Sequence, residues 1–302
     1  MARQRILITG SNGLLGQKLI AALRDDDGTD LIATSRGEDR STDPLGDLYR
    51  SLDITDKAAV QAVFDEVRPE VVIHTAAMTN VDACELDPGA CHLQNVEATR
   101  HLVEAARELD SHFIFLSTDF IFDGKEGPYR EEDEPAPLSV YGRSKLEGER
   151  LVQESGLPRW AIARTIIVFG TAPGLSRSNV VLWAKQALEK GDPIRVVDDQ
   201  WRMPTLAEDL ADGCIRIARQ GATGTFHLSG PDGMSILELV ERVGAFFGLD
   251  TTKVTPVKSD TLGQPARRPP RTGFVLDKAR RELGYAPHTF EEGLAILRDQ
   301  LV

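Results

Sequence analysis

The stretch RILITGSNGLLG, residues 5–16, runs from an apolar segment directly into three glycines at intervals of three. Arg5–Thr9 has the apolar character of a buried strand, and Leu14–Arg24 has the periodicity of an amphipathic helix. Glycines at such a turn allow a tight bend, a close approach of the backbone to a pyrophosphate, and close packing of helix on strand. The free N–H groups that begin the helix favour an anion. G-x-x-G-x-x-G is a weak signal by itself, but its place in a chain-initial βαβ unit predicts a dinucleotide site.

Strand-like and helix-like segments continue to alternate through the first half of the chain. Apolar strands separated by helices indicate a parallel sheet that is covered on both faces. We therefore expect an α/β fold, a Rossmann doubly wound parallel sheet with a smaller C-terminal substrate-binding lobe. The expected strands are 30–35, 71–76, 112–117 and 160–165; the expected helices are 57–68 (capped by Thr55 or Asp56), about 91–109 (with Asp87-Pro88 as its start signal) and 140–155.

The second half of the sequence has a different character. Ser235 with Glu238, and Thr289 with Glu292, have the spacing of capping boxes and predict helices that begin there. Between them, the proline-rich and basic stretch TLGQPARRPPRTGF at 261–274 cannot form one continuous regular element. We expect residues 1–165 to form the Rossmann domain, with about 195–222 returning to it. The substrate-binding lobe then comprises about 166–194 and 223–302.

The tip of the second expected strand indicates which dinucleotide is bound. An acidic residue there would accept hydrogen bonds from the ribose of NAD, but the sequence has Ser35 and Arg36 instead. A hydroxyl and a guanidinium suit a 2'-phosphate, so NADP(H) is favoured over NAD(H), although Arg36 could also be a solvated loop charge. Asp53 could reach the adenine, and the small residues Ala76 and Ala77 would let a cofactor lie against the backbone. These three could equally be turn and packing residues.

Two further motifs suggest carbonyl reduction. Tyr141 and Lys145 in VYGRSKLEGE are four residues apart and so share one helix face. A tyrosine hydroxyl can act as the acid if a neighbouring cation lowers its pKa. In FLSTDFIFDG, the hydroxyl residue Thr118 and its neighbour Asp119 end a strand, at the edge where doubly wound sheets bind ligands. Each motif alone is common on ordinary helices and turns, whereas their combination with the glycine turn is specific.

Composition narrows the classes of function. The chain has 302 residues and a formal net charge of −12, which argues against nucleic acid as the main partner. The longest apolar run is far short of the ~20 residues that a membrane span needs. The start of the sequence has no secretory signal pattern, and the cysteines fit neither a disulfide framework nor a zinc site, so we expect a cytoplasmic protein. The histidines lack metal-ligand spacing, so we predict no metal site. No nucleophile elbow or Walker loop is present, which disfavours a hydrolase or a nucleoside triphosphatase.

Arginines in the second half could bind a diphosphate in spite of the acidic background. Arg202, Arg267, Arg268 and Arg271 lie in expected loops, and guanidinium groups match phosphate geometry. Trp201 could stack on a base or a sugar, or serve only in packing.

The segments LITGSNGLLG, IHTAAMTNVDACE, FLSTDFIFDG, PLSVYGRSKLEGE, RTIIVFG and DDQWRMPT, with the A-R-R-P loop, resemble the extended short-chain dehydrogenase/reductases from end to end. Within them the chain is most similar to the dTDP-4-dehydrorhamnose reductases. The resemblance implies NADPH-dependent reduction of a nucleotide-linked 4-keto-6-deoxysugar, dTDP-4-dehydrorhamnose to dTDP-rhamnose, and a possible homodimer. It also implies that Thr79, Val81 and Asp82 lie near cofactor or substrate and that Asn95 supports the active site.

Motifs and resemblance together give a set of expected site residues. The catalytic residues are Thr118, Tyr141 and Lys145. The cofactor would contact Gly10, Asn12, Gly13, Leu14, Leu15, Gly16, Ser35, Arg36, Asp53, Ile54, Ala76, Ala77, Thr79, Tyr141 and Lys145. The substrate would contact Thr118, Asp119, Trp201, Arg202, Arg267 and Arg268.

Two other functions stay open. The same segments resemble the regulatory β subunit of methionine adenosyltransferase, which binds NADP without a catalytic role. A nucleotide-sugar epimerase or dehydratase would retain oxidised cofactor through its cycle. Two departures from the reductase pattern bear on the substrate: the glycine turn lacks the Gln often found before its last glycine, and Trp201-Arg202 replaces the usual small residue before Met203.

Overall fold

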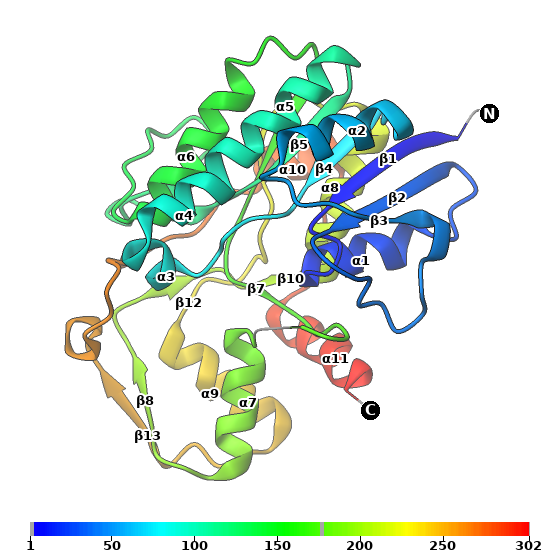
Figure 1. Cartoon of the computed structure of the whole chain (residues 1–302). Coiled ribbons are helices and arrows are strands. Elements are labelled where there is room, and N and C mark those ends of the chain that lie inside the picture. The colour runs from blue at the N-terminus through cyan, green and yellow to red at the C-terminus, as the bar shows by residue number, and fades with distance from the viewer. Residues whose placement is uncertain (1–2, 176–177, 302) are drawn as a thin grey trace.

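A computed structural model describes residues 3–175 and 178–301, so residues 1, 2, 176, 177 and 302 of the expected domain ranges lie outside the description. Seven strands form one sheet in the order β11-β6-β5-β4-β1-β2-β3, and every neighbouring pair is parallel. Chain order reverses between the neighbouring strands β1 and β4 (Figure 1), and doubly wound sheets bind ligands at the carboxyl ends of strands at such a reversal. The predicted Rossmann sheet is confirmed.

The strands of this sheet are β1 (Gln4–Thr9), β2 (Thr29–Ser35), β3 (Tyr49–Ser51), β4 (Val71–His74), β5 (His112–Thr118), β6 (Trp160–Thr165) and β11 (Gly224–His227). The helices associated with it are α1 (Leu14–Leu23), α2 (Lys57–Val67), α3 (Val81–Leu86), α4 (Pro88–His92), α5 (Ala98–Glu108), α6 (Val140–Gln153), α8 (Ala207–Gln220) and α10 (Asp277–Leu283).

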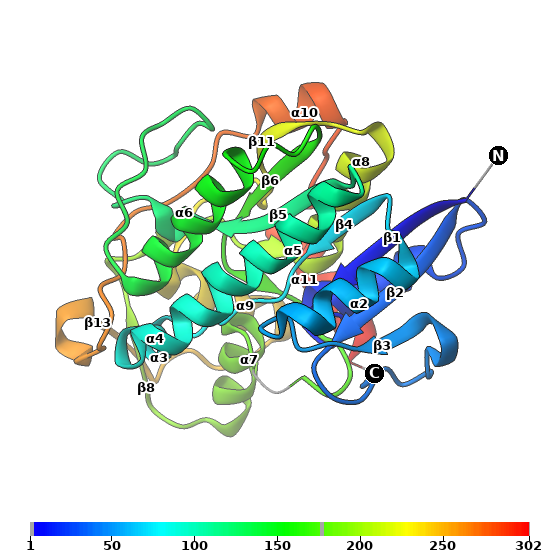
Figure 2. The ribbon, with the colours of Figure 1, turned by 45° about the horizontal axis from the view of Figure 1, so that its top comes forward.

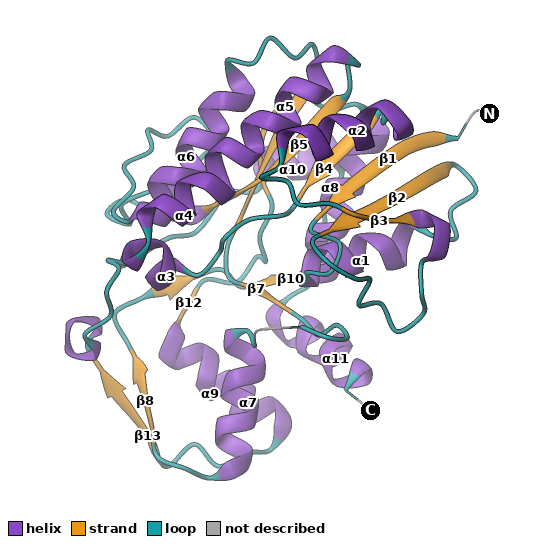
Figure 3. Ribbon diagram, viewed as in Figure 1, coloured by secondary structure: helices purple, strands orange, loops and turns teal. Residues whose placement is uncertain are grey.

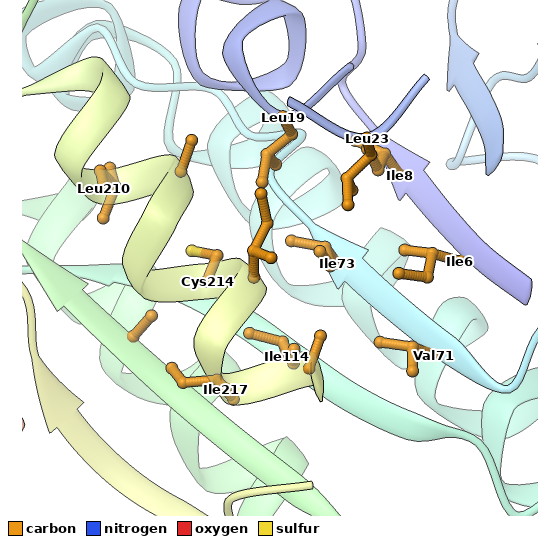
Figure 4. Close-up of a cluster of buried hydrophobic side chains, with 14 of the residues drawn as sticks. Ile6, Ile8, Leu19, Leu23, Val71, Ile73, Ile114, Leu210, Cys214 and Ile217 are labelled. Carbon is orange, nitrogen blue, oxygen red and sulfur yellow. The ribbon is translucent and has the colours of Figure 1, made fainter. Parts of the chain in front are cut away.

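Side chains of the sheet alternate between two apolar cores. Ile6 and Ile8 of β1 pack with α1, α8 and α10 on one face, and the close-up in Figure 4 shows this core. Leu7, between them, packs with α2, α5 and α6 on the other face. Figure 2 shows these three helices over that face of the sheet. Successive side chains of a strand point to opposite faces, so a strand covered on both sides must be apolar throughout. This explains why RILIT shows no alternation of polar and apolar residues.

The remaining elements form a smaller lobe below the carboxyl edge of the sheet (Figure 3). Its core lies among three helices and a parallel strand pair. The lobe contains α7 (Val180–Lys190), α9 (Ile236–Phe247), α11 (Phe290–Gln300) and the pair β8 (Ile194–Val197) with β13 (Val254–Val257). Two short pairs join the lobe to the sheet: β7 (Val168–Phe169) with β10 (Thr205–Leu206), and β9 (Trp201–Arg202) with β12 (Met234–Ser235).

The division between the two parts differs from the expected ranges. Strand β8 was expected to return to the Rossmann domain, but it pairs with β13 in the lobe. Strand β11 was expected in the lobe, but it extends the main sheet beside β6 because its Phe226 completes the core that α8 covers. Helix α10 also belongs to that core through Ala279 and Leu283. The chain therefore crosses between the two parts several times.

Helix starts agree with the predicted caps except at one position. Asp56, and not Thr55, caps α2, since its carboxylate accepts hydrogen bonds from the backbone N–H groups of the second and third residues of the helix. The box at Thr289 and Glu292 is complete. At Ser235 the box is only half formed: the hydroxyl accepts the Glu238 N–H, but the Glu238 carboxylate lies 3.9 Å from Arg242.

The helix expected at 91–109 starts earlier and is irregular. It begins at Pro88, where the Asp87 carboxylate accepts the Ala90 N–H, and it continues through α5. Between α4 and α5 it opens into a π-helical turn at Leu93–Glu97. Such turns occur often at functional sites, and this one contains Asn95.

Candidate active site

The glycine-rich turn lies at the carboxyl end of β1 and leaves no room for side chains at Gly10 and Gly16. Gly10 has φ +75°, and a Cβ on it would lie 2.7 Å from Thr75 Oγ1. A Cβ on Gly16 would lie 2.3 Å from the Gly10 carbonyl oxygen, so α1 packs directly on the turn. Helix α1 begins without a side-chain cap, and among the described residues the buried Ser11 hydroxyl has no partner. An uncapped helix start beside an unpaired hydroxyl fits the pyrophosphate of a dinucleotide.

The loop after β2 is held beside this turn. The Asn12 side chain donates to the Glu38 carbonyl oxygen at 2.8 Å and accepts from the Arg40 N–H at 3.0 Å. Asn12 was expected to contact the cofactor, and the structure shows that it shapes the loop. Arg36 is exposed in this loop. Hydrogen bonds from Thr55 lower the pKa of Asp53, and the Arg36 charge contributes to the same shift. The assignment of these residues to NADP(H) stays a prediction.

The structure brings Thr118, Tyr141 and Lys145 together. Thr118 ends β5, and Tyr141 and Lys145 lie on the first turns of α6. All three are buried. Burial raises the pKa of the Tyr141 hydroxyl, and a hydrogen bond with Thr118 opposes this effect. Burial lowers the pKa of Lys145 to about 7, opposed by Glu149, and the ammonium lies 4.0 Å from the centre of the Phe115 ring.

Asp119, which was expected to contact the substrate, is buried and surrounded by protein partners. Its carboxylate accepts from Thr272 Oγ1 at 2.5 Å and from Thr118 Oγ1 at 3.1 Å. Arg202 Nε lies 3.7 Å from the same carboxylate. Burial raises the pKa of Asp119, and the Arg202 charge opposes this shift. Asp119 thus joins the end of β5 to β9 and to the basic stretch at 261–274.

Two of the four candidate arginines already have protein partners. The buried Arg202 donates to the carbonyl oxygens of Trp201 and Pro269 at 2.7 and 2.8 Å. Arg268 forms a two-pronged ion pair with Asp82 on α3, at 3.1 and 2.6 Å. Although burial opposes it, hydrogen bonds from Arg268 and the Ala266 N–H lower the pKa of Asp82. These contacts fasten the stretch 261–274 to the Rossmann domain.

The other two arginines are exposed. Arg267 lies on the surface of the same stretch, and the Arg271 guanidinium lies 5.6 Å from the ring centre of Trp201. A cavity of about 260 Å³ adjoins Trp201 and Arg271 and is also lined by Arg202 and Thr272. The structure therefore places Trp201 at a cavity wall, half-exposed, beside one buried and one exposed guanidinium.

The resemblance gave Asn95 a role in supporting the active site, whereas its partner Ser144 and the nearby Glu149 were not predicted from the sequence. Asn95 lies in the π-helical turn, and its side-chain amide accepts from the Met78 N–H at 2.7 Å and donates to the Met78 carbonyl oxygen at 3.1 Å. It also donates to Ser144 Oγ at 3.0 Å. Glu149, one turn after Lys145, forms a buried ion pair with Arg164. Its position four residues after the lysine was a usable signal, whereas the partner on β6 was not.

Comparison with known proteins agrees with this architecture. The model of the RmlD substrate binding domain family matches residues 4–302. The dTDP-4-dehydrorhamnose reductase of Streptomyces griseus is 36% identical over 285 residues, which is 92% of this chain and 87% of that protein. The methionine adenosyltransferase 2 subunit beta of Pongo abelii is 30% identical over 310 residues, covering 92% and 90%. A crystal structure of the Bacillus anthracis dTDP-4-dehydrorhamnose reductase in complex with NADP has a TM-score of 0.85 at 28% identity, and 99% of each chain is covered.

Among the described residues, no helix is both long enough and apolar enough to cross a membrane.

Proposed function

The chain belongs to the RmlD substrate binding domain family, and from this membership we propose that it is an NADPH-dependent reductase of a nucleotide-linked 4-keto-6-deoxysugar. The observation that supports this most strongly is the position of Thr118, Tyr141 and Lys145 at the carboxyl edge of the sheet, beside the glycine-rich turn. The first substrate to test is dTDP-4-dehydrorhamnose, with dTDP-rhamnose as the product.

The residues for the cofactor follow from the turn and the loop beside it. The start of α1 would receive the pyrophosphate, and Arg36 would pair with the 2'-phosphate. NADPH held there would supply a hydride for the sugar carbonyl carbon. Lys145 would hold the nicotinamide ribose.

The chain itself would supply the proton for the substrate oxygen, from the Tyr141 hydroxyl. Burial raises the pKa of Tyr141, so the hydroxyl keeps its proton until negative charge develops on the substrate oxygen. The Lys145 charge stabilises the phenolate that proton transfer leaves behind, and Thr118 orients the carbonyl through its hydroxyl. In the absence of ligands, burial also lowers the pKa of Lys145, so the protonated state of this residue is sensitive to what occupies the site.

Binding of the nucleotide diphosphate would position the sugar. Arg267 is exposed and forms no ion pair among the described residues, whereas Arg268 of the same A-R-R-P loop is paired with Asp82. Binding of the nucleotide diphosphate, at a distance from the reacting carbonyl, would orient that carbonyl. A free 4-ketosugar, which lacks the diphosphate, should therefore be a poor substrate.

The test follows NADPH oxidation with a panel of nucleotide 4-ketosugars. Tyr141→Phe should lower turnover by about 10²- to 10⁴-fold and leave NADPH affinity nearly unchanged. Tyr285→Phe is the matched control, since this buried tyrosine donates to the Ser229 carbonyl away from the catalytic set. Full activity in Tyr141→Phe would contradict the assigned proton donor, and no oxidation with any ketosugar would contradict the reductase.

A second candidate is a regulatory subunit that binds NADP without turnover. The 30% identity to methionine adenosyltransferase 2 subunit beta favours it, because that similarity covers 92% of the chain. Calorimetric titration with dTDP separates the two proposals. Binding of dTDP supports the nucleotide-sugar reductase, while no binding with or without NADP supports the regulatory subunit.

A further inference from the structure

Five buried polar side chains connect the glycine-rich turn to the catalytic helix. They are Thr9 at the end of β1, His74 at the end of β4, Thr99 on α5, Asn95 in the π-helical turn and Ser144 on α6. Each is at most 6% exposed. Burying a polar group costs stability unless the group is hydrogen-bonded. The hydrogen bonds of each side chain therefore show how the five residues are connected.

The first three residues form a continuous hydrogen-bonded path. Thr9 Oγ1 lies 2.7 Å from His74 Nδ1, and His74 Nε2 lies 3.1 Å from Thr99 Oγ1. The Thr99 hydroxyl donates to the Asn95 carbonyl oxygen at 2.8 Å, so it must accept from His74. This assigns the proton of the imidazole to Nε2, and Nδ1 accepts from the Thr9 hydroxyl.

The path continues from Asn95 into α6. The Asn95 side-chain amide binds both the backbone N–H and the backbone carbonyl of Met78, and it donates to Ser144 Oγ at 3.0 Å. The Ser144 hydroxyl in turn donates to the Tyr141 carbonyl oxygen at 2.8 Å. Ser144 lies between the two catalytic residues of the helix, so its position fixes the turn that carries Tyr141 and Lys145.

The imidazole of His74 stays neutral in this position. It lies between the rings of Phe113 and Phe115, with centre distances of 5.9 and 5.7 Å. Burial lowers the pKa of His74 to about 3, and the Lys145 charge acts in the same direction. A neutral imidazole offers one donor and one acceptor, which is what the hydroxyls of Thr99 and Thr9 require.

We propose that His74 is a positioning residue that fixes the catalytic helix relative to the glycine-rich turn through Thr99, Asn95 and Ser144. The side chain joins β1 to α5 across β4, and the rest of the path joins α5 to α6. The residue after His74 also holds the last residue before the turn, because Thr75 Oγ1 donates to the Thr9 carbonyl oxygen at 2.6 Å. Cofactor binding at the turn and the placement of Tyr141 are therefore coupled through one set of fully paired buried groups.

The first test uses NADPH alone and does not depend on the proposed substrate. In the unaltered protein, saturating NADPH should slow amide hydrogen exchange both in the glycine-rich turn and in α6. In His74→Phe, which fills the space but removes both hydrogen bonds, the turn should still be protected and α6 should lose its protection. His112→Phe is the matched control, since His112 is also fully buried but lies at the amino end of β5, and among the described residues its ring nitrogens have no hydrogen-bond partner.

The second test measures kinetics with the ketosugar that the unaltered protein reduces. His74→Phe should lower kcat by at least about tenfold with a smaller change in the Kd for NADPH, because small displacements of a catalytic group are costly. His74→Gln, whose amide can accept from one hydroxyl and donate to the other, should recover part of kcat. Thr99→Val, a milder change, should shift kcat in the same direction if His74→Phe folds poorly.

The outcomes separate this inference from the proposed function. If His74→Phe matches His112→Phe in the protection of α6, His74 is only a packing residue and the proposal is overturned. Equal kcat in His74→Phe and His74→Gln would also overturn it. Absence of turnover in the unaltered protein contradicts the reductase, while the exchange measurement still decides the role of His74.

Discussion

The buried ion pair between Arg164 on β6 and Glu149 on α6 gives a stability prediction of defined size. Their side chains are 4% and 1% exposed, and two hydrogen bonds join them at 3.0 and 2.7 Å. Arg164→Met keeps an apolar stem but leaves the Glu149 carboxylate buried without its cation. Removing one partner of such a pair costs about 3–5 kcal/mol. Arg164 also donates to the Glu131 carbonyl at 3.1 Å, which places the expected loss toward the upper part of that range.

Urea unfolding at neutral pH measures this free energy, with two variants for comparison. Lys57→Met removes the cation of an exposed pair with Glu104 and should cost no more than about 1 kcal/mol. Adding Glu149→Gln to Arg164→Met removes the uncompensated charge and should restore much of the loss. A loss in Arg164→Met no larger than that in Lys57→Met would refute the reasoning, since it would mean that solvent compensates the carboxylate.

Three further predictions concern cofactor, pH and substrate. Arg36→Ala should reduce the preference for NADPH over NADH by about 1–3 kcal/mol, as measured by the Kd values of both cofactors; equal Kd values in the unaltered protein would contradict the 2'-phosphate assignment. Because the pKa of Lys145 is about 7 in the folded protein and 10.5 is its ordinary value, the unfolded chain binds more protons between these pH values. Folding stability without ligands should therefore gain up to about 1.4 kcal/mol per pH unit from Lys145 in this window, a gain that unfolding curves at pH 7 and pH 9 should show and that Lys145→Met should lack. Arg267→Ala should raise KM for the nucleotide sugar more than it lowers kcat, whereas Arg268→Ala should lower both kcat and stability through loss of the Asp82 pair; identical kinetic effects of the two variants would be inconsistent with these separate roles.

The order and character of the elements could be predicted because they depend on local sequence. Apolar runs such as VVIH and HFIFLST must be buried on both faces, and helix starts follow from single capping residues such as Asp56 and Thr289. The placement of Thr118 at the carboxyl edge of the sheet could be predicted as well, since the carboxyl ends of parallel strands meet at one edge.

Contacts between distant segments could not be predicted in the same way. Nothing near Arg202 in the sequence indicates that its guanidinium lies beside Asp119, and a loop arginine is ordinarily exposed. Strand β11 has only four residues, too few for periodicity to show which sheet it joins. His74 could be recognised as a strand residue, but its two hydroxyl partners come from β1 and α5 and become visible only when the sheet is assembled.

The late position of β11 and α10 in the chain has a consequence for folding during synthesis on the ribosome. The first six strands of the sheet emerge from the ribosome before β11, so until then β6 has one open edge with unpaired backbone groups. The core that contains Leu210 and Phe226 also stays incomplete until α10 has been synthesised. A fragment that ends at residue 222 would therefore keep the exposed edge permanently and would be prone to aggregation. The nucleotide-binding half cannot be produced as an independent unit by cutting the chain at a single point.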